Sequence, residues 1–146
     1  MFKNTHSWSI LLLTISVIAL TPGCSKQARK ERYLKKAEQY FATKDYNKAE
    51  VEYLNVLRLD RLNRNAIQRL GIIYFEEGSP LRAFSLLLKA KELAPDDLEA
   101  RLNLGITIMA QGRTNEALSS FDAVLQKSPT NALALRYVQA LRARTQ

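Results

Sequence analysis

The chain has 146 residues, of which 47% are hydrophobic and 25% charged, with only 5 Gly and 4 Pro, so it is one folded domain rather than a disordered or collagenous chain. Its 22 Lys and Arg against 14 Asp and Glu give a formal charge of +8, which is compatible with nucleic acid or an anionic membrane surface and specifies neither. The single cysteine, Cys24, excludes an internal disulfide and a cysteine-based metal centre.

The amino terminus has the pattern of an export signal. Lys3 supplies a positive end, and Ile10–Leu20 supplies an apolar core followed by the small or turn-forming residues Thr21-Pro22-Gly23. The apolar core is well short of the roughly 20 residues that a lasting transmembrane helix needs. Residues 1–23 are therefore predicted to be a signal peptide, removed from the working protein.

Gly23-Cys24, directly after this apolar core, resembles the lipobox of bacterial lipoproteins. The resemblance implies that Cys24 is lipidated and becomes the new amino terminus, and that Ser25 after it favours the outer membrane, on the periplasmic side. The sequence departs from the lipobox in two respects: Leu20 lies four residues before the cysteine, with Thr21 in the place where leucine is usual, and Pro22 is unusual in this motif. The alternative is ordinary secretion with an incidental cysteine. Lipidation is favoured because it explains the position of a lone thiol, and more than one acyl chain gives stable anchoring.

Residues 24–29 are predicted to be the lipid anchor and a basic tether. Six basic residues and one acid, Glu31, cluster at and beyond this tether. They could form a membrane-facing collar or a solvated tether that grades into a first helix beginning by about Ala28, and the second interpretation is favoured. The basic residues are Lys26, Arg29, Lys30, Arg32, Lys35 and Lys36.

The central part of the chain repeats itself at one fixed interval, the distance along the sequence from Gly71 to Gly105, which we call the repeat interval. Such a fixed period is typical of stacked repeats, and a fainter copy, with Ala37 and Ala49 ahead of Gly71 and Ala83, precedes the two clear ones. The recurring pairs are Gly71 and Gly105, Gly78 and Gly112, Ala83 and Ala117, and Pro95 and Pro129.

Each period contains two blocks of apolar residues at helical spacing, separated by a turn. In the second unit Gly78 is expected to close a helix in the left-handed conformation. Ser79 is expected to cap the next helix, with Pro80 at its first position, and Pro95 to stop it. Thr114 is expected to be the corresponding cap in the third unit. Every unit is thus predicted to be a helical hairpin.

The pattern resembles the tetratricopeptide repeat, which has units of about 34 residues with small residues and a proline at fixed positions. The resemblance places units at 30–63, 64–97 and 98–131, and the first unit departs from the pattern at Lys36 and Arg61. Residues 132–146 are predicted to be a capping helix and not the start of a fourth unit, because Gln139 occupies a slot where a paired helix requires a small residue. In this helix Leu135, Val138 and Leu141 are expected to face inward. The implied fold class is all-α, an α-solenoid of three such units plus the capping helix.

The resemblance also implies a concave groove built by the first helix of each unit. The groove is expected to be apolar and to bind an apolar or amphipathic segment of a protein or peptide, unless neighbouring helices or the ends of the chain cover it. The basic clamp that grips an acidic tail in some relatives is not expected, because its positions carry Leu34, Glu38, Arg69, Glu99 and Asn103. The expected groove residues are Leu34, Glu38, Phe41, Gln68, Ile72, Phe75, Leu102, Ile106 and Met109.

Catalysis is not expected from this sequence. The only histidine, His6, lies in the predicted signal peptide, and the glycines are spaced by the repeat rather than as a phosphate loop. Neither a metal site nor a cofactor is predicted, and the scattered basic residues do not form a nucleic-acid footprint. The prediction is a membrane-anchored scaffold that recruits or positions a partner, resembling the repeat lipoproteins of pilus biogenesis, outer-membrane assembly or exopolysaccharide export. The alternatives are a periplasmic chaperone-like holder of unfolded apolar segments, or the amino-terminal part of a longer repeat protein.

Overall fold

The computed structural model describes residues 22–144, and the predicted signal peptide lies almost entirely outside this range. The described residues form seven α-helices and no strand, which confirms the predicted all-α class. None of these helices combines the length and the apolar character that crossing a membrane requires. The helices are α1 Pro22–Ala42, α2 Tyr46–Leu59, α3 Arg64–Glu76, α4 Pro80–Leu93, α5 Leu98–Ala110, α6 Thr114–Lys127 and α7 Ala132–Arg144.

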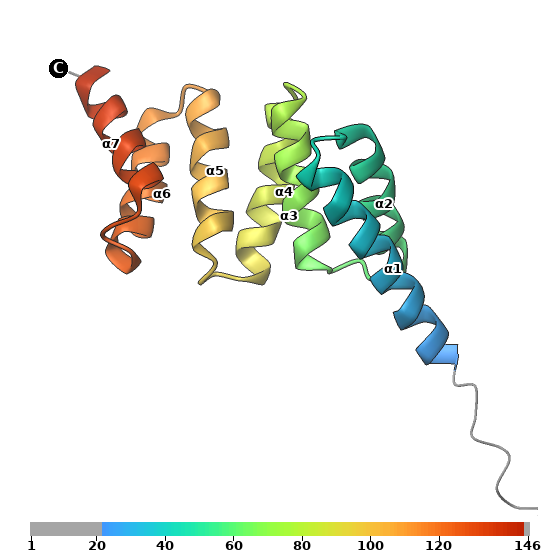
Figure 1. The fold of residues 1–146 in the computed structure, drawn as a ribbon. Helices are drawn as coiled ribbons and strands as arrows, with labels where there is room; N and C mark the ends of the chain where they lie inside the picture. Colours follow the sequence, from blue (N-terminus) through green and yellow to red (C-terminus); the bar gives the residue numbers. More distant parts are fainter. Residues whose placement is uncertain (1–21, 145–146) are drawn as a thin grey trace, which may run out of the picture.

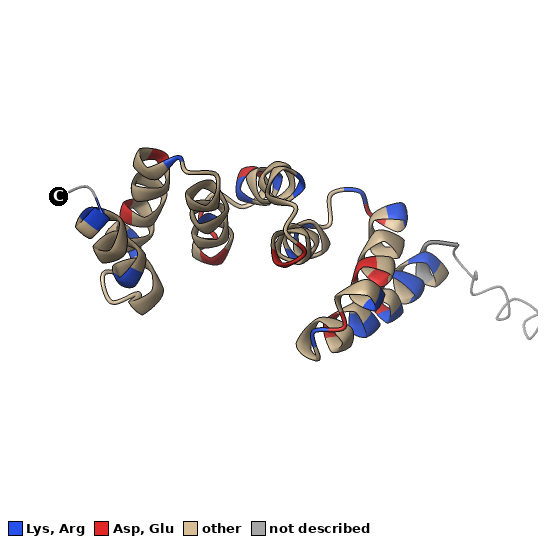
Figure 2. Cartoon of the chain, turned by 90° about the horizontal axis from the view of Figure 1, so that it is seen from above, with Lys and Arg blue, Asp and Glu red and all other residues tan. Residues whose placement is uncertain are grey.

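The helices stand side by side in a row, with α1 at one end and α7 at the other (Figure 1). Three pairs, α1 with α2, α3 with α4 and α5 with α6, form antiparallel hairpins, and each pair packs against the next. Viewed from above, α3, α5 and α7 lie on one side of the row, and α4 and α6 lie on the other (Figure 2). This arrangement is an α-solenoid, as predicted.

The turn inside each hairpin has the same backbone conformation, and the three turns are separated by the repeat interval. Lys44, Gly78 and Gly112 all have positive φ, of 57°, 74° and 77°. In the second hairpin the Gly78 N–H donates to the Phe75 carbonyl and the Ser79 N–H donates to the Tyr74 carbonyl, and the other two hairpins repeat both bonds. This confirms the helix-closing role predicted for Gly78. Lys44 adopts the left-handed conformation without being glycine, which is unfavourable for an L side chain.

The connections between hairpins are also repeated, through side chains that cap the following helix. Asn63, Asp97 and Asn131, again separated by the repeat interval, each accept a hydrogen bond from the backbone N–H three residues later, at 2.9–3.1 Å. Each bond satisfies one of the backbone donors that a helix start leaves free. Two periodic devices, a left-handed turn within each hairpin and an Asn or Asp cap between hairpins, thus set the stacking of α3, α5 and α7.

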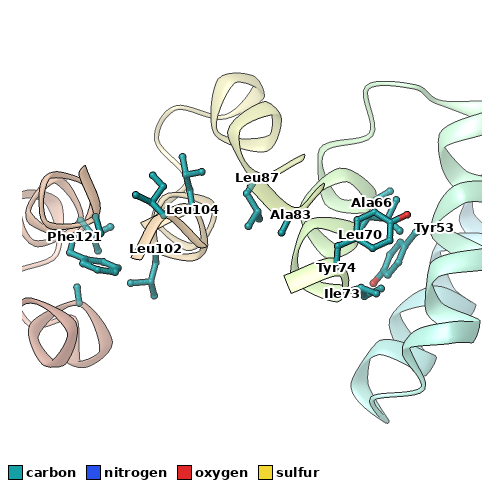
Figure 3. Packing of buried hydrophobic residues seen from close by; sticks show 14 of the residues in the cluster. Tyr53, Ala66, Leu70, Ile73, Tyr74, Ala83, Leu87, Leu102, Leu104 and Phe121 are labelled. Carbon is teal, nitrogen blue, oxygen red and sulfur yellow. The ribbon is translucent and has the colours of Figure 1, made fainter. Parts of the chain in front are cut away.

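One continuous apolar core runs through the row between the two layers of helices (Figure 3). Its largest fully buried side chains include Tyr53, Leu70, Leu87 and Phe121. The paired helices touch most closely at the repeated glycine, where Gly105 leaves no room for a side chain against Phe121. Gly71 does the same against Leu87, so both hairpins depend on a missing Cβ at this position.

The structure corrects three local expectations. Helix α1 begins at Pro22 rather than near Ala28, so residues 24–29 are helical in their backbone. Thr114 is the first residue of α6 and not its cap. Leu135 was expected to face inward but is 39% exposed, because the buried side of α7 is formed by Ala134, Val138 and Leu141.

Candidate partner-binding surface

The nine predicted groove residues lie on α1, α3 and α5, and the structure divides them by accessibility. Gln68 and Leu102 are buried, with only 5% and 8% of their surfaces exposed. They therefore offer almost no surface to a partner, because a repeat position fixes the side of a helix and not how far neighbouring side chains cover it. The other seven are half-buried: Leu34, Glu38, Phe41, Ile72, Phe75, Ile106 and Met109.

Three of these residues, Ile72, Phe75 and Ile106, come together in a pocket between α3 and α5. The pocket has a volume of about 120 Å³. Two further residues of α5, Asn103 and Thr107, line it, and the Thr107 hydroxyl donates to the Asn103 carbonyl at 2.9 Å. The remaining lining residues are Glu76, Leu87 and Tyr137.

Tyr137 of α7 is a lining residue that sequence reasoning missed. Its ring stacks on Phe121 of α6, with centroids 5.1 Å apart and planes inclined by 13°. This contact fixes the ring beside the pocket, while the side chain stays half-buried. The signal was available, because Tyr137 follows Asn103 by the repeat interval and Asn103 follows Arg69 by the same interval. The prediction that 132–146 form a cap leaves α7 outside the groove.

A second pocket lies on α7 and also has Tyr137 in its lining. It has a volume of about 210 Å³ and is lined by Leu133, Arg136, Tyr137 and Ala140. These residues share one face of the helix, since residues three and four apart are neighbours on a helix surface. The accessible apolar surface therefore continues from α3 and α5 onto α7, and Tyr137 divides it.

The α1 end of the surface mixes apolar and charged groups. An open pocket of about 600 Å³ on α1 is lined by Leu34 and Ala42 together with Glu31, Lys35, Glu38 and Gln39. Glu38 accepts hydrogen bonds from the Tyr53 hydroxyl and from the Asn65 side chain, both at 2.9 Å. Burial, and then the hydrogen bond to Glu38, raises the pKa of Tyr53. The Glu38 carboxylate thus joins α1, α2 and α3, and its position is explained by the internal contacts of the protein.

Arg69 extends this network across the surface to α5. Its guanidinium lies 3.8 Å from the Glu38 carboxylate, donates to Glu99 at 3.1 Å, and stands 4.7 Å from the centre of the Phe41 ring. One face of Phe41 is therefore covered by a cation. We call the accessible region of α3, α5 and α7 the central groove: Ile72, Phe75, Ile106, Met109 and Tyr137.

The remaining site predictions concern lipid and metal. Cys24 lies in the first turn of α1, and its side chain is outside the described structure. Within residues 22–144, no group of three or more His, Cys, Asp and Glu side chains is arranged to hold a metal ion. The central groove is therefore the candidate binding site.

Comparison with known proteins agrees with this architecture. Residues 74–144 match the family model described as tetratricopeptide repeat. The chain has the tetratricopeptide-repeat fold. Its structure is similar to the Arabidopsis OM64 TPR domain, with a TM-score of 0.76 and 22% identity over 82% of this chain and 98% of that one. It is also similar to the first TPR of Spaghetti (RPAP3) bound to the HSP90 peptide SRMEEVD, with a TM-score of 0.75 and 20% identity over 81% and 94% of the two chains.

Among curated sequences, this chain is 34% identical over 85 residues to Superkiller protein 3 of Saccharomyces cerevisiae. The match covers 58% of this chain and 6% of that protein, so the chain spans only a small part of its relative. Tetratricopeptide-repeat domains are protein–protein interaction modules that bind peptides.

The structure also shows the surroundings of the positions at which some relatives carry a basic clamp. Of the five residues at the clamp positions, the only cation is Arg69, and its guanidinium lies beside two carboxylates, those of Glu38 and Glu99. An acidic peptide tail would have to compete with both of these acids. The α1 end of the surface is therefore electrostatically unsuited to a terminal carboxylate.

Proposed function

We propose that the chain is a non-catalytic scaffold, a membrane-anchored tetratricopeptide-repeat lipoprotein that recruits or positions a partner in an envelope assembly or export system. The observation that carries the binding role is the pocket between α3 and α5, with Ile72, Phe75 and Ile106 in its lining. Apolar pockets with a few polar groups are the usual form of a recognition site. The fold itself is an interaction scaffold.

The proposed anchor is supported by the amino-terminal sequence. Cys24 follows an apolar core and a Gly, and a lipid on this residue would place α1, and then the rest of the row, next to the membrane. The outer membrane, facing the periplasm, is the proposed location because Ser25 follows the cysteine. The anchor would restrict the partners to proteins that reach that surface.

Two alternatives differ from this proposal, one in the number of clients and the other in the length of the protein. A periplasmic chaperone-like holder would bind unfolded apolar segments of many clients, and the central groove is apolar enough for this role. An amino-terminal part of a longer repeat protein is favoured by the exposed Leu135 on α7, where a further helix would pack. The scaffold that recruits a specific partner remains our proposal because the groove is interrupted by specific polar groups, Glu76 and Asn103.

Photo-crosslinking in intact cells tests this proposal. A photoreactive amino acid replaces Phe75 or Met109 in the groove, and the captured proteins are identified by mass spectrometry. A matched control carries the same amino acid at Leu81 of α4, which is 75% exposed and outside the groove. One dominant protein captured from the groove positions alone is the expected result. Many dissimilar clients would favour the chaperone-like alternative, and equal capture from Leu81 would contradict a binding role for the groove.

A further inference from the structure

The two pockets of the groove share Tyr137 and carry opposite charges. The pocket between α3 and α5 has one ionisable carboxylate in its lining, that of Glu76, and the pocket on α7 has one cation, that of Arg136. Both side chains are exposed, and in the part of the chain that the structure describes neither takes part in an ion pair. They are therefore available to a partner, unlike Glu38 and Arg69.

The size of the first pocket limits what can enter it. Its volume of about 120 Å³ is slightly below that of an apolar protein cavity of about 150 Å³ that holds one benzene molecule. One branched aliphatic side chain, such as leucine or isoleucine, fits this space. The lining by Ile72, Phe75, Leu87 and Ile106 suits such a side chain.

A polar group in the same lining is suited to the backbone of a bound segment. No hydrogen bond within residues 22–144 engages the Asn103 carboxamide, although the Asn103 backbone carbonyl accepts from Thr107. A carboxamide can both donate to a carbonyl and accept from an N–H. It can thus hold the peptide group next to a side chain that has entered the pocket.

Taken together, these features define the chemistry of the partner. We propose that the central groove binds a segment in which one leucine-like side chain fills the pocket beside Tyr137, with a Lys or Arg on the Glu76 side and an Asp or Glu on the Arg136 side. This inference rests on the proposed binding role of the groove and specifies the partner that it recognises. The charges select the partner and its direction, and burial of the leucine supplies most of the affinity.

Four labelled peptides of Gly and Ser with a central leucine test this proposal by fluorescence anisotropy with the detergent-solubilised full chain. The first carries Lys on one side of the leucine and Glu on the other. The second and third carry Lys or Glu on both sides, and the fourth is the first with alanine in place of leucine. The mixed peptide should bind best. We expect binding to be about tenfold weaker for the alanine peptide and about threefold weaker for each like-charged peptide.

Two protein variants should exchange this preference. Glu76→Lys should favour the peptide with two Glu, and Arg136→Glu should favour the peptide with two Lys. Because both residues are exposed, the melting temperatures should not change. The proposal is overturned if the mixed peptide shows no saturable binding, if the alanine peptide binds equally well, or if the variants keep the order of the unmodified protein. A partner crosslinked at Phe75 together with any of these results would leave the scaffold role intact and remove only the specificity proposed here.

Discussion

The ring of Phe121 in α6 lies directly over the backbone of Gly105 in α5. A Cβ atom added at Gly105 would come within 2.7 Å of Cε1 of this ring and 3.1 Å of Cβ of Ser120. The ring is fully buried, so the atoms around it restrict its movement. The glycine is therefore a requirement of the hairpin, although it weakens the helix that contains it.

Gly105→Ala should consequently destabilise the protein. Alanine improves helix propensity by about 1 kcal/mol, but overpacking a buried contact costs about 1–3 kcal/mol, so we expect a net loss of about 1 kcal/mol. Urea unfolding followed by circular dichroism measures it. In a Phe121→Leu background the cost of Gly105→Ala should be smaller, since the smaller side chain makes room. A gain in stability from Gly105→Ala alone would show that α5 and α6 can separate without cost.

Phe75→Glu should weaken the capture of the partner without unfolding the chain. Phe75 is half-buried and lines the pocket between α3 and α5, so a carboxylate there places an unpaired charge in the apolar part of the groove. Pull-down of the crosslinked partner measures the first effect, and the melting temperature measures the second. Leu81→Glu is the matched control, because Leu81 is an exposed apolar residue of α4 outside the groove. A large drop in melting temperature for Phe75→Glu would identify Phe75 as a core residue.

Two buried tyrosines predict a loss of stability at alkaline pH. Burial, and then the hydrogen bond from its hydroxyl to Glu50, raises the pKa of Tyr74 to about 12, and burial together with Glu38 raises the pKa of Tyr53 as well. An unfolded tyrosine has a pKa of about 10. Above that pH the unfolded chain loses the proton while the folded chain keeps it, so stability that is fully present below pH 10 falls as the pH rises toward 12.

The variant Tyr74→Phe isolates this effect. It removes the titrating hydroxyl, so its free energy of unfolding should decrease less between pH 9 and pH 11 than that of the unmodified protein. At pH 7 it should be less stable by about 1–2 kcal/mol, because Glu50 loses a hydrogen bond to its carboxylate. Parallel slopes for the two proteins between pH 9 and pH 11 would show that other groups control the alkaline behaviour.

Cys24→Ala should release the protein from the membrane. If the thiol carries the acyl chains, its removal abolishes metabolic labelling with a radioactive fatty acid and moves the protein to the soluble fraction. Ser25→Ala, which keeps the cysteine, is the control and should remain labelled. Membrane retention of the Cys24→Ala protein would contradict the proposed lipid anchor.

The periodic part of the fold could be predicted from sequence, because the same physical need recurs once in every repeat unit. Gly78 and Gly112 supply a left-handed turn, and Gly71 and Gly105 supply a close approach between helices. Lys44 shows the limit of this reasoning. It adopts the same left-handed conformation although it is not a glycine, because the flanking helices α1 and α2 impose the turn.

The extent to which each site residue is buried was less predictable from the sequence. Gln68 and Leu102 occupy the same repeat position as the half-buried Leu34, yet both are buried, because neighbouring first helices flank them on two sides and Leu34 belongs to the terminal helix α1. Tyr137 was missed for a related reason. Its place in the repeat could be read from the sequence, but its role depends on where α7 packs on α6, through the stacking of Tyr137 on Phe121.

In the described row of helices, α1 and α7 lie at opposite ends, and the strongest packing is between helices adjacent in the sequence. A chain built in this way gains its stability from nearest neighbours. The helices at the two ends of the described row should therefore open more easily than the inner ones, so amide protons of α7 should exchange with solvent sooner than those of α3 and α4. Because α7 carries Tyr137 and Arg136, one half of the groove would be assembled and dismantled by this fraying, and a partner bound there would hold the last helix in place.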